Sequence, residues 1–147
     1  MTVAPVRGPV VIDADVFSAA LHGPSRIATA YEPLIVGRPA FISFQTVAEL
    51  RFGVRIRNWG AGRMLKMEAR IAAAETVQSG PDLIDAYIRL RVDCQRAGHA
   101  LAQARHDADR WIAATAVRLG IPLVSNDRIF ADAPGLTVET LGTTESG

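Results

Sequence analysis

The chain has 147 residues, of which 49% are hydrophobic, and this is enough for one domain with a buried core. A formal net charge of only +1 excludes a histone-like protein and a protein that coats membranes through its charge. The single cysteine, Cys94, excludes an internal disulfide and a cysteine-based metal site.

The first ten residues contain two prolines and no long apolar run. We therefore expect no signal peptide, no membrane span and no membrane partner, and the low cysteine content favours the cytoplasm. After this segment, short apolar runs alternate with amphipathic patterns. In chain order they predict a strand at 10–12, helices at 15–21 and 25–36, a strand at 41–44, helices at 45–58 and 61–74, a weak strand at 76–78, helices at 82–97 and 107–119, and strands at 122–125 and 136–139.

Proline and glycine mark several of these boundaries. Pro81 precedes the helix at 82–97 and Gly98 follows it, while Gly120 closes the last helix. Strands that alternate with helices indicate an α/β fold, in which a parallel sheet of about four or five strands has helices on both faces. We expect a single domain over 1–147, with its core at about 10–139 and short flexible ends.

Four acidic residues fall where such a sheet would form a site. Asp13 ends the first strand, and Glu49 lies one turn into the helix after the second strand. Asp109 is at the start of the helix before the fourth strand, and Asp127 follows that strand. Because sites in parallel sheets form at the carboxyl ends of the strands, we expect these side chains to converge at one edge.

Most of the nearby acids also have a purely structural interpretation. Asp13 would fit a turn, and Asp127 would fit an Asx turn or a helix cap. Asp15 is expected to be the N-cap of the helix at 15–21, and Asp107 to be a first-turn carboxylate stabilised by the helix dipole. The sequence leaves both interpretations open for Asp13 and Asp127.

Asp109 is harder to explain structurally. At about 100° per residue, it shares a stripe with Ile112, Ala113 and Ala116 that faces the expected core. Asp107 lies nearly opposite, toward water. A carboxylate at the end of a buried apolar stripe is costly unless it is paired or bound to metal, and this stripe carries no Lys or Arg. We therefore favour a metal-related role for Asp109.

Glu49 lies away from the face of its helix that carries Arg51 and Arg55. Clustered carboxylates repel one another, and a hard divalent cation relieves that repulsion. Oxygen ligands suit Mg²⁺ or Mn²⁺ rather than Zn²⁺. The three histidines show no metal-ligand spacing, and neither a phosphate-binding glycine loop nor a nucleophile elbow is present.

The cations are almost all arginine, since Lys66 is the only lysine among 16. Arginine matches phosphate oxygens with a planar fork, so the bias is compatible with RNA handling, although a genome rich in G and C would produce it as well. Arg51, Arg55 and Arg57 are candidates for contact with an RNA backbone. The alternative is an ordinary solvated helix face.

Four segments together resemble the motifs of PIN-domain nucleases. They are Val-Ile-Asp-Ala-Asp-Val at 11–16, Ile-Ser through Ala-Glu-Leu with Gly at 42–53, Asp-Arg-Trp-Ile-Ala-Ala-Thr-Ala at 109–116, and Leu-Val-Ser-Asn-Asp followed by Phe and Gly-Leu at 123–136. The resemblance runs from about Val10 to Glu139. The third segment is quite specific, and all four in order are a strong signal.

The resemblance is to VapC-type toxins of VapBC toxin–antitoxin pairs. It implies a metal-dependent endoribonuclease that uses Mg²⁺ or Mn²⁺, leaves 5′-phosphate and 3′-hydroxyl ends, forms a homodimer and binds a cognate VapB-like antitoxin. The residues carried over as catalytic and metal-binding are Asp13, Glu49, Asp109 and Asp127.

Three auxiliary positions depart from the family pattern. Asp15 stands where Asn or Ser is frequent, so the site has an extra carboxylate. Ser125 stands where Thr is common, which keeps the hydroxyl, and Asp107 is a further acid of open role.

Two alternatives remain. A haloacid-dehalogenase-like phosphatase also ends its first strand in Asp-x-Asp, and Ser43 and Lys66 would then have to serve it. A catalytically inactive PIN scaffold would bind RNA or protein without cutting, but such scaffolds usually lack the acids that this chain retains.

Overall fold

The computed structural model describes residues 7–141, and its strands form one parallel sheet in the order β3-β2-β1-β4-β5. The strands are β1 (Val10–Ile12), β2 (Ala40–Ser43), β3 (Glu75–Val77), β4 (Leu123–Val124) and β5 (Val138–Glu139). The predicted parallel sheet is confirmed. The flexible ends expected from the sequence fall largely on 1–6 and 142–147, outside the described residues.

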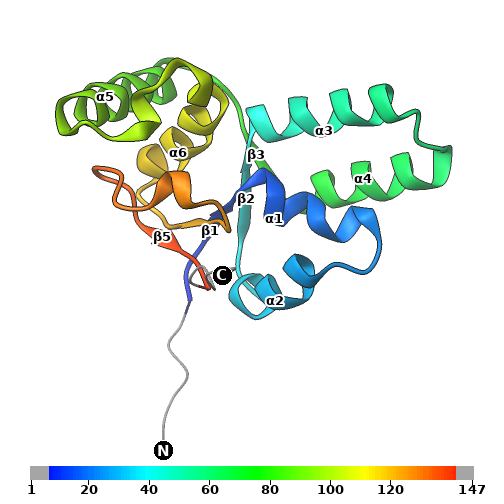
Figure 1. Cartoon of the computed structure of the whole chain (residues 1–147). Helices are drawn as coiled ribbons and strands as arrows, with labels where there is room; N and C mark the ends of the chain where they lie inside the picture. Colours follow the sequence, from blue (N-terminus) through cyan, green and yellow to red (C-terminus); the bar gives the residue numbers. More distant parts are fainter. Residues whose placement is uncertain (1–6, 142–147) are drawn as a thin grey trace, which may run out of the picture.

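Helices cover both faces of this sheet, as predicted. They are α1 (Ala14–Ala19), α2 (Arg26–Ile35), α3 (Phe44–Arg57), α4 (Ala61–Ala73), α5 (Pro81–Ala97) and α6 (Asp107–Leu119). Helices α5 and α6 lie on one side of the sheet, and α1 to α4 lie on the other (Figure 1). Among residues 7–141, no helix combines the length and apolar character needed to cross a membrane.

Strand β1 is the centre of the core and is buried on both faces. Val11 belongs to an apolar cluster with Leu90 of α5 and Ile112 of α6. Val10 and Ile12 belong to the cluster on the opposite face, which contains residues of α1 to α4. Since successive side chains of a strand point to opposite faces, this apolar run fits a strand packed between two helical layers.

The order of the strands places a topological switch point between β1 and β4. The chain builds β1, β2 and β3 in one direction, then returns to add β4 and β5 on the other side of β1. Val11 pairs with Phe41 of β2 and with Leu123 of β4. In open parallel sheets, ligands bind outside the carboxyl ends of the strands at such a point.

Two local expectations were wrong, and one connection contains helices that were not predicted. The N-cap of α1 is Asp13 rather than Asp15, because the Asp13 carboxylate accepts from the amide of Ala14. Phe44 belongs to α3 rather than to the preceding strand, because the Ser43 hydroxyl caps the helix. The connection between α5 and α6 contains two short 3-10 helices, η2 (Ala100–Ala102) and η3 (Ala104–His106), that the sequence pattern did not indicate.

Candidate active site

Asp13 is the most enclosed of the predicted site acids, with 4% of its surface exposed. Its backbone amide continues the sheet by donating to the carbonyl of Val124 over 2.9 Å. One carboxylate oxygen accepts from the amide of Ala14 at 2.7 Å. The other accepts from the hydroxyl of Ser125, also at 2.7 Å. Asp13 and Ser125 therefore join the ends of β1 and β4 at the switch point.

Burial of this carboxylate raises the pKa of Asp13 from 3.8 to about 7. The negative charges of Asp15 and Asp109 raise it further, while the hydrogen bonds from Ser125 and Ala14 oppose the shift. With a pKa of about 7 this carboxyl is only partly ionised at neutral pH, so a nearby positive charge would favour its ionised form.

Asp15 and Asp127 lie on the more open side of the same edge. Both are exposed. Partial burial raises the pKa of Asp15, and the charges of Asp127 and Asp109 add to this effect. Asp127 caps a short 3-10 helix, η4 (Arg128–Phe130), by accepting from the amide of Ile129 at 3.0 Å, so the predicted cap role is present. Its own amide donates to the Ser125 hydroxyl at 3.0 Å.

Glu49 approaches the cluster from the second turn of α3. It is exposed, and the side-chain amide of Gln45 donates to it at 3.4 Å. Partial burial raises the pKa of Glu49, and the charges of Asp109 and Asp15 raise it as well. Glu49 therefore lies within electrostatic reach of Asp109 and Asp15.

Asp109 lies in the first turn of α6, at the end of its buried stripe. Ile112, Ala113 and Ala116 are all buried, as the predicted stripe requires, and Ala114 and Thr115 beside them are buried as well. The carboxylate accepts from His106 at 3.0 Å, and 30% of the Asp109 side chain is exposed. His106 was missed because it lies one turn before Asp109 in a segment with no helical pattern.

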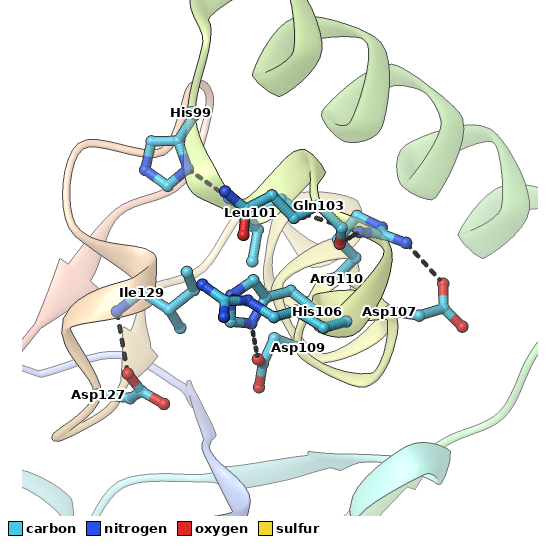
Figure 2. A network of polar contacts seen from close by, with 10 residues as sticks. His99, Leu101, Gln103, His106, Asp107, Asp109, Arg110, Asp127 and Ile129 are labelled. Atoms are coloured by element: carbon cyan, nitrogen blue, oxygen red, sulfur yellow. Dashed lines mark hydrogen bonds and ion pairs between the residues drawn. The ribbon is translucent and has the colours of Figure 1, made fainter.

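Asp107 is directed elsewhere. The hydroxyl of Tyr87 donates to it in a short hydrogen bond, and the guanidinium of Arg110 donates to the same oxygen at 3.1 Å. The hydrogen bond from Tyr87, followed by the charge of Arg110, lowers the pKa of Asp107. Figure 2 shows Asp107 and Asp109 pointing in different directions from α6. Asp107 therefore anchors α6 to α5 and is not one of the coupled acids.

Five carboxylates are thus coupled through their charges at one edge of the sheet: Asp13, Asp15, Glu49, Asp109 and Asp127. As the side chains stand, no group of three or more His, Cys, Asp or Glu residues within 7–141 is placed to hold a metal ion. The donors are nevertheless hard oxygen ligands, and the mutual repulsion of these acids is of the kind that a divalent cation relieves. The chemistry of the set fits Mg²⁺ or Mn²⁺, although its side chains have not converged.

The arginines predicted to contact RNA lie farther along α3. Arg51, Arg55 and Arg57 are all exposed. Arg51 forms a bidentate ion pair with Glu68 of α4, with distances of 3.0 and 3.1 Å. Arg55 and Arg57 form no ion pair with any described residue. Arg51 is therefore partly engaged within the protein, whereas the other two are more available.

Tyr31 and Arg110 support the site, and no periodic pattern in the sequence marks either of them as a contact residue. The Tyr31 hydroxyl, on α2, lies 3.2 Å from the carbonyl of Ser125 and 3.0 Å from the side-chain oxygen of Asn126. It also lies 3.1 Å from the Thr140 hydroxyl. Arg110 is 1% exposed and binds the carbonyls that precede α6. Long-range hydrogen bonds of this kind have no sequence periodicity.

Comparison with known proteins gives a family and a fold. The family model of the PIN domain matches residues 10–136. In the structure of VapBC2 from Rickettsia felis bound to a DNA fragment from their promoter, the similar chain has a TM-score of 0.73 and 21% identity, with 90% of this chain and 98% of that chain covered.

Two further solved structures are similar. For FitAcB from Neisseria gonorrhoeae, the TM-score is 0.71 at 23% identity, over 88% of this chain and 95% of that one. For VapBC-5 from Mycobacterium tuberculosis, of the VapBC family of toxin–antitoxin systems, it is 0.63 at 29% identity, over 90% and 96%. A comparison with curated proteins gives no match.

The phosphatase alternative finds no support at the site. Ser43 uses its hydroxyl to cap α3, and Lys66 is exposed on α4. The matched segment 10–136 instead spans all four acids that the sequence motifs singled out. The chain therefore belongs to the PIN-domain family.

Proposed function

We propose that this protein is a divalent-metal-dependent endoribonuclease and the toxin component of a type II toxin–antitoxin pair. The observation that carries the proposal is the set of five coupled carboxylates at the switch point of the sheet, three of which have raised pKa values. Family membership supports nuclease chemistry. The similar VapBC structures, of which VapBC-5 is described as a member of a family of toxin–antitoxin systems, support the toxin role.

Asp13, Glu49, Asp109 and Asp127 would hold Mg²⁺ or Mn²⁺, with Asp15 as an auxiliary acid. A bound cation would neutralise charge on the attacked phosphate and lower the pKa of a water molecule. Exposed side chains turn more easily than buried ones, so Glu49 and Asp127 are the ones expected to rotate inward.

The fixed part of the site is the pair formed by Asp13 and Ser125. Two hydrogen bonds hold the Asp13 carboxylate, and Ser125 also accepts from the amide of Asp127. This arrangement keeps one acid in place while the scissile phosphate is bound. The proposed reaction is in-line attack of water on phosphorus with cleavage of the bond to the 3′ oxygen, which leaves 5′-phosphate and 3′-hydroxyl ends.

The RNA is expected to follow α3 as it leaves the site. Arg55 and Arg57 are exposed and offer guanidinium groups to backbone phosphates, while Arg51 would have to leave Glu68 to do the same. Phosphate contacts position an RNA without reading its sequence, so these residues set affinity rather than target choice.

A VapB-like antitoxin is the expected protein partner. The acidic cluster would attract a basic side chain, most favourably arginine, that reaches the carboxylates and competes with metal. Co-expression of this chain with the product of the adjacent gene should give a complex with no nuclease activity. Purification of the chain alone from such cells, with no effect of its overexpression on growth, would argue against the toxin role.

Self-association is the second proposed interaction. Ile84, Ile88 and Val92 follow one another along α5 with 45%, 52% and 37% of their surfaces exposed. An exposed apolar stripe of this kind is a frequent mark of an interface. Light scattering should give the mass of a homodimer for the wild type and that of a monomer for Ile88→Asp.

The function is tested by incubating the purified chain with total cellular RNA and mapping the ends. We expect cleavage with Mg²⁺ or Mn²⁺, none with EDTA, and poor activity with Zn²⁺ because clustered nitrogen and sulfur ligands are lacking. Binding of RNA without cleavage under all metal conditions would favour the inactive-scaffold alternative.

A further inference from the structure

A chain of two hydrogen bonds connects an exposed arginine to the acidic cluster. The Nε of Arg105 lies 3.2 Å from Nε2 of His106, and Nδ1 of His106 lies 3.0 Å from a carboxylate oxygen of Asp109. Arginine nitrogen can only donate, so Nε2 of the imidazole is the acceptor. The imidazole proton is then on Nδ1 and is donated to Asp109. The three residues form a hydrogen-bonded series in which the imidazole of His106 separates the guanidinium from the carboxylate.

The segment that carries this series is held rigidly from inside the protein. Arg110, which is almost fully buried, donates to the carbonyls of Leu101 at 2.9 Å and Gln103 at 2.6 Å. It also donates to Asp107 at 3.1 Å. Figure 2 shows this buried guanidinium beside the turn that ends at His106. Arg105 lies within that turn, in η3, so its backbone position is fixed relative to Asp109.

The guanidinium of Arg105 retains most of its capacity to bind. Only its Nε is engaged, and its two terminal nitrogens have no hydrogen bond or ion pair with other residues in 7–141. The residue is exposed. By contrast, Arg51 is paired with Glu68 and Arg110 is occupied by carbonyls. Arg105 is thus a cation whose two terminal nitrogens are free, and two hydrogen bonds link it through His106 to Asp109, a candidate metal ligand.

We propose that Arg105 binds a phosphate of the RNA backbone next to the phosphate that is cleaved. The proposal rests on the ribonuclease function above. A guanidinium fork matches two phosphate oxygens and remains charged at any physiological pH. An acidic site repels RNA in general, and a cation fixed at its rim offsets that repulsion where the strand must enter.

The test compares Arg105→Ala with Arg118→Ala. Arg118 is also an exposed arginine, so its removal changes the net charge of the protein equally. It lies in the last turn of α6, at the end opposite Asp109, and is therefore the control for a loss of charge away from the site. The probe is a short fluorescent single-stranded RNA of mixed sequence, titrated in EDTA over a series of salt concentrations so that binding is measured without cleavage. Arg105→Ala should bind about tenfold more weakly, the size expected for one charge-assisted hydrogen-bonded contact.

The salt dependence identifies the lost contact as a phosphate contact. The slope of log affinity against log salt should fall in magnitude by about 0.7 for Arg105→Ala, since one phosphate contact to a single strand is removed. Arg118→Ala should keep both the affinity and the slope of the wild type. With Mg²⁺ present, Arg105→Ala should raise KM far more than it lowers kcat.

Equal affinity and slope for Arg105→Ala and the wild type would overturn the assignment of Arg105. The same conclusion follows if Arg118→Ala shows an equal loss, because the effect would then be one of overall charge. A wild-type protein that binds the probe but never cleaves RNA would refute the nuclease function, while the binding comparison would still decide the role of Arg105. Failure of the wild type to bind RNA would overturn both.

Discussion

Asp13→Asn should make the metal-free protein more stable at high pH. In an unfolded chain the carboxyl titrates at 3.8, whereas in the fold its pKa is about 7. Between these values the folded protein holds a proton that the unfolded chain has lost. The stability due to this proton is complete below pH 4 and is lost as the pH rises through 7. At about 1.4 kcal/mol per pKa unit, the loss amounts to as much as about 4 kcal/mol.

Asparagine keeps the shape and the contacts but cannot ionise. Its carbonyl oxygen can accept from the amide of Ala14, as Asn N-caps do, and its amide can donate to the Ser125 hydroxyl. Urea unfolding of the wild type and Asp13→Asn in EDTA should therefore give similar free energies at pH 4. At pH 8 the variant should be the more stable, by up to about 4 kcal/mol. A constant difference at every pH, or a variant that is weaker at pH 8, would refute the buried-charge explanation.

Three further predictions concern the surroundings of the site. Tyr31→Phe removes a hydroxyl that contacts the Ser125 carbonyl and Asn126, so the free energy of unfolding measured in urea should fall by about 1–3 kcal/mol. An unchanged unfolding midpoint would mean that other contacts hold the loop after β4. Arg110→Met leaves the carbonyls of Leu101 and Gln103 without their donor, removes one of two donors from Asp107, and should cost about 3 kcal/mol or more in thermal unfolding; wild-type stability would contradict the anchoring role. Mg²⁺ or Mn²⁺ should raise the melting temperature by mass action, and Asp109→Asn should abolish this shift; a shift that survives the substitution would place the ion elsewhere.

The sheet and its helices were predictable because they follow from repeated patterns. The all-apolar run of β1 matches a strand that is buried on both faces. The apolar stripe that begins at Asp109 marks a helix that packs into the core, although Ala114 and Thr115, outside the stripe, are buried as well. The boundaries were less predictable because capping decides them. Asp13 and Ser43 each start a helix through a side-chain hydrogen bond, and nothing in the periodicity distinguishes a cap from a strand end.

The acids of the candidate site could be selected from the sequence because Asp13, Glu49 and Asp127 follow strand ends and Asp109 lies at the end of an apolar helical stripe. The pKa values of these acids and their neighbours could not be predicted in the same way. The raised pKa of Asp13 results from burial beneath neighbouring elements, and the lowered pKa of Asp107 results from Tyr87 on another helix. The link from Arg105 through His106 to Asp109 depends on a 3-10 turn next to carbonyls that the buried Arg110 holds, and no periodic pattern indicates such a turn.

The most direct test of the site is RNA cleavage by Asp109→Asn and Asp107→Asn with Mg²⁺ or Mn²⁺. The two acids are neighbours on α6, but only Asp109 is coupled to the carboxylates at the sheet edge, while Asp107 binds Tyr87 and Arg110. Asparagine at 107 still offers an oxygen to both partners. We predict that Asp107→Asn retains most of the wild-type cleavage and that Asp109→Asn has none. Cleavage by Asp109→Asn at the wild-type rate, or wild-type cleavage that persists in EDTA, would contradict a metal-dependent site built on these acids.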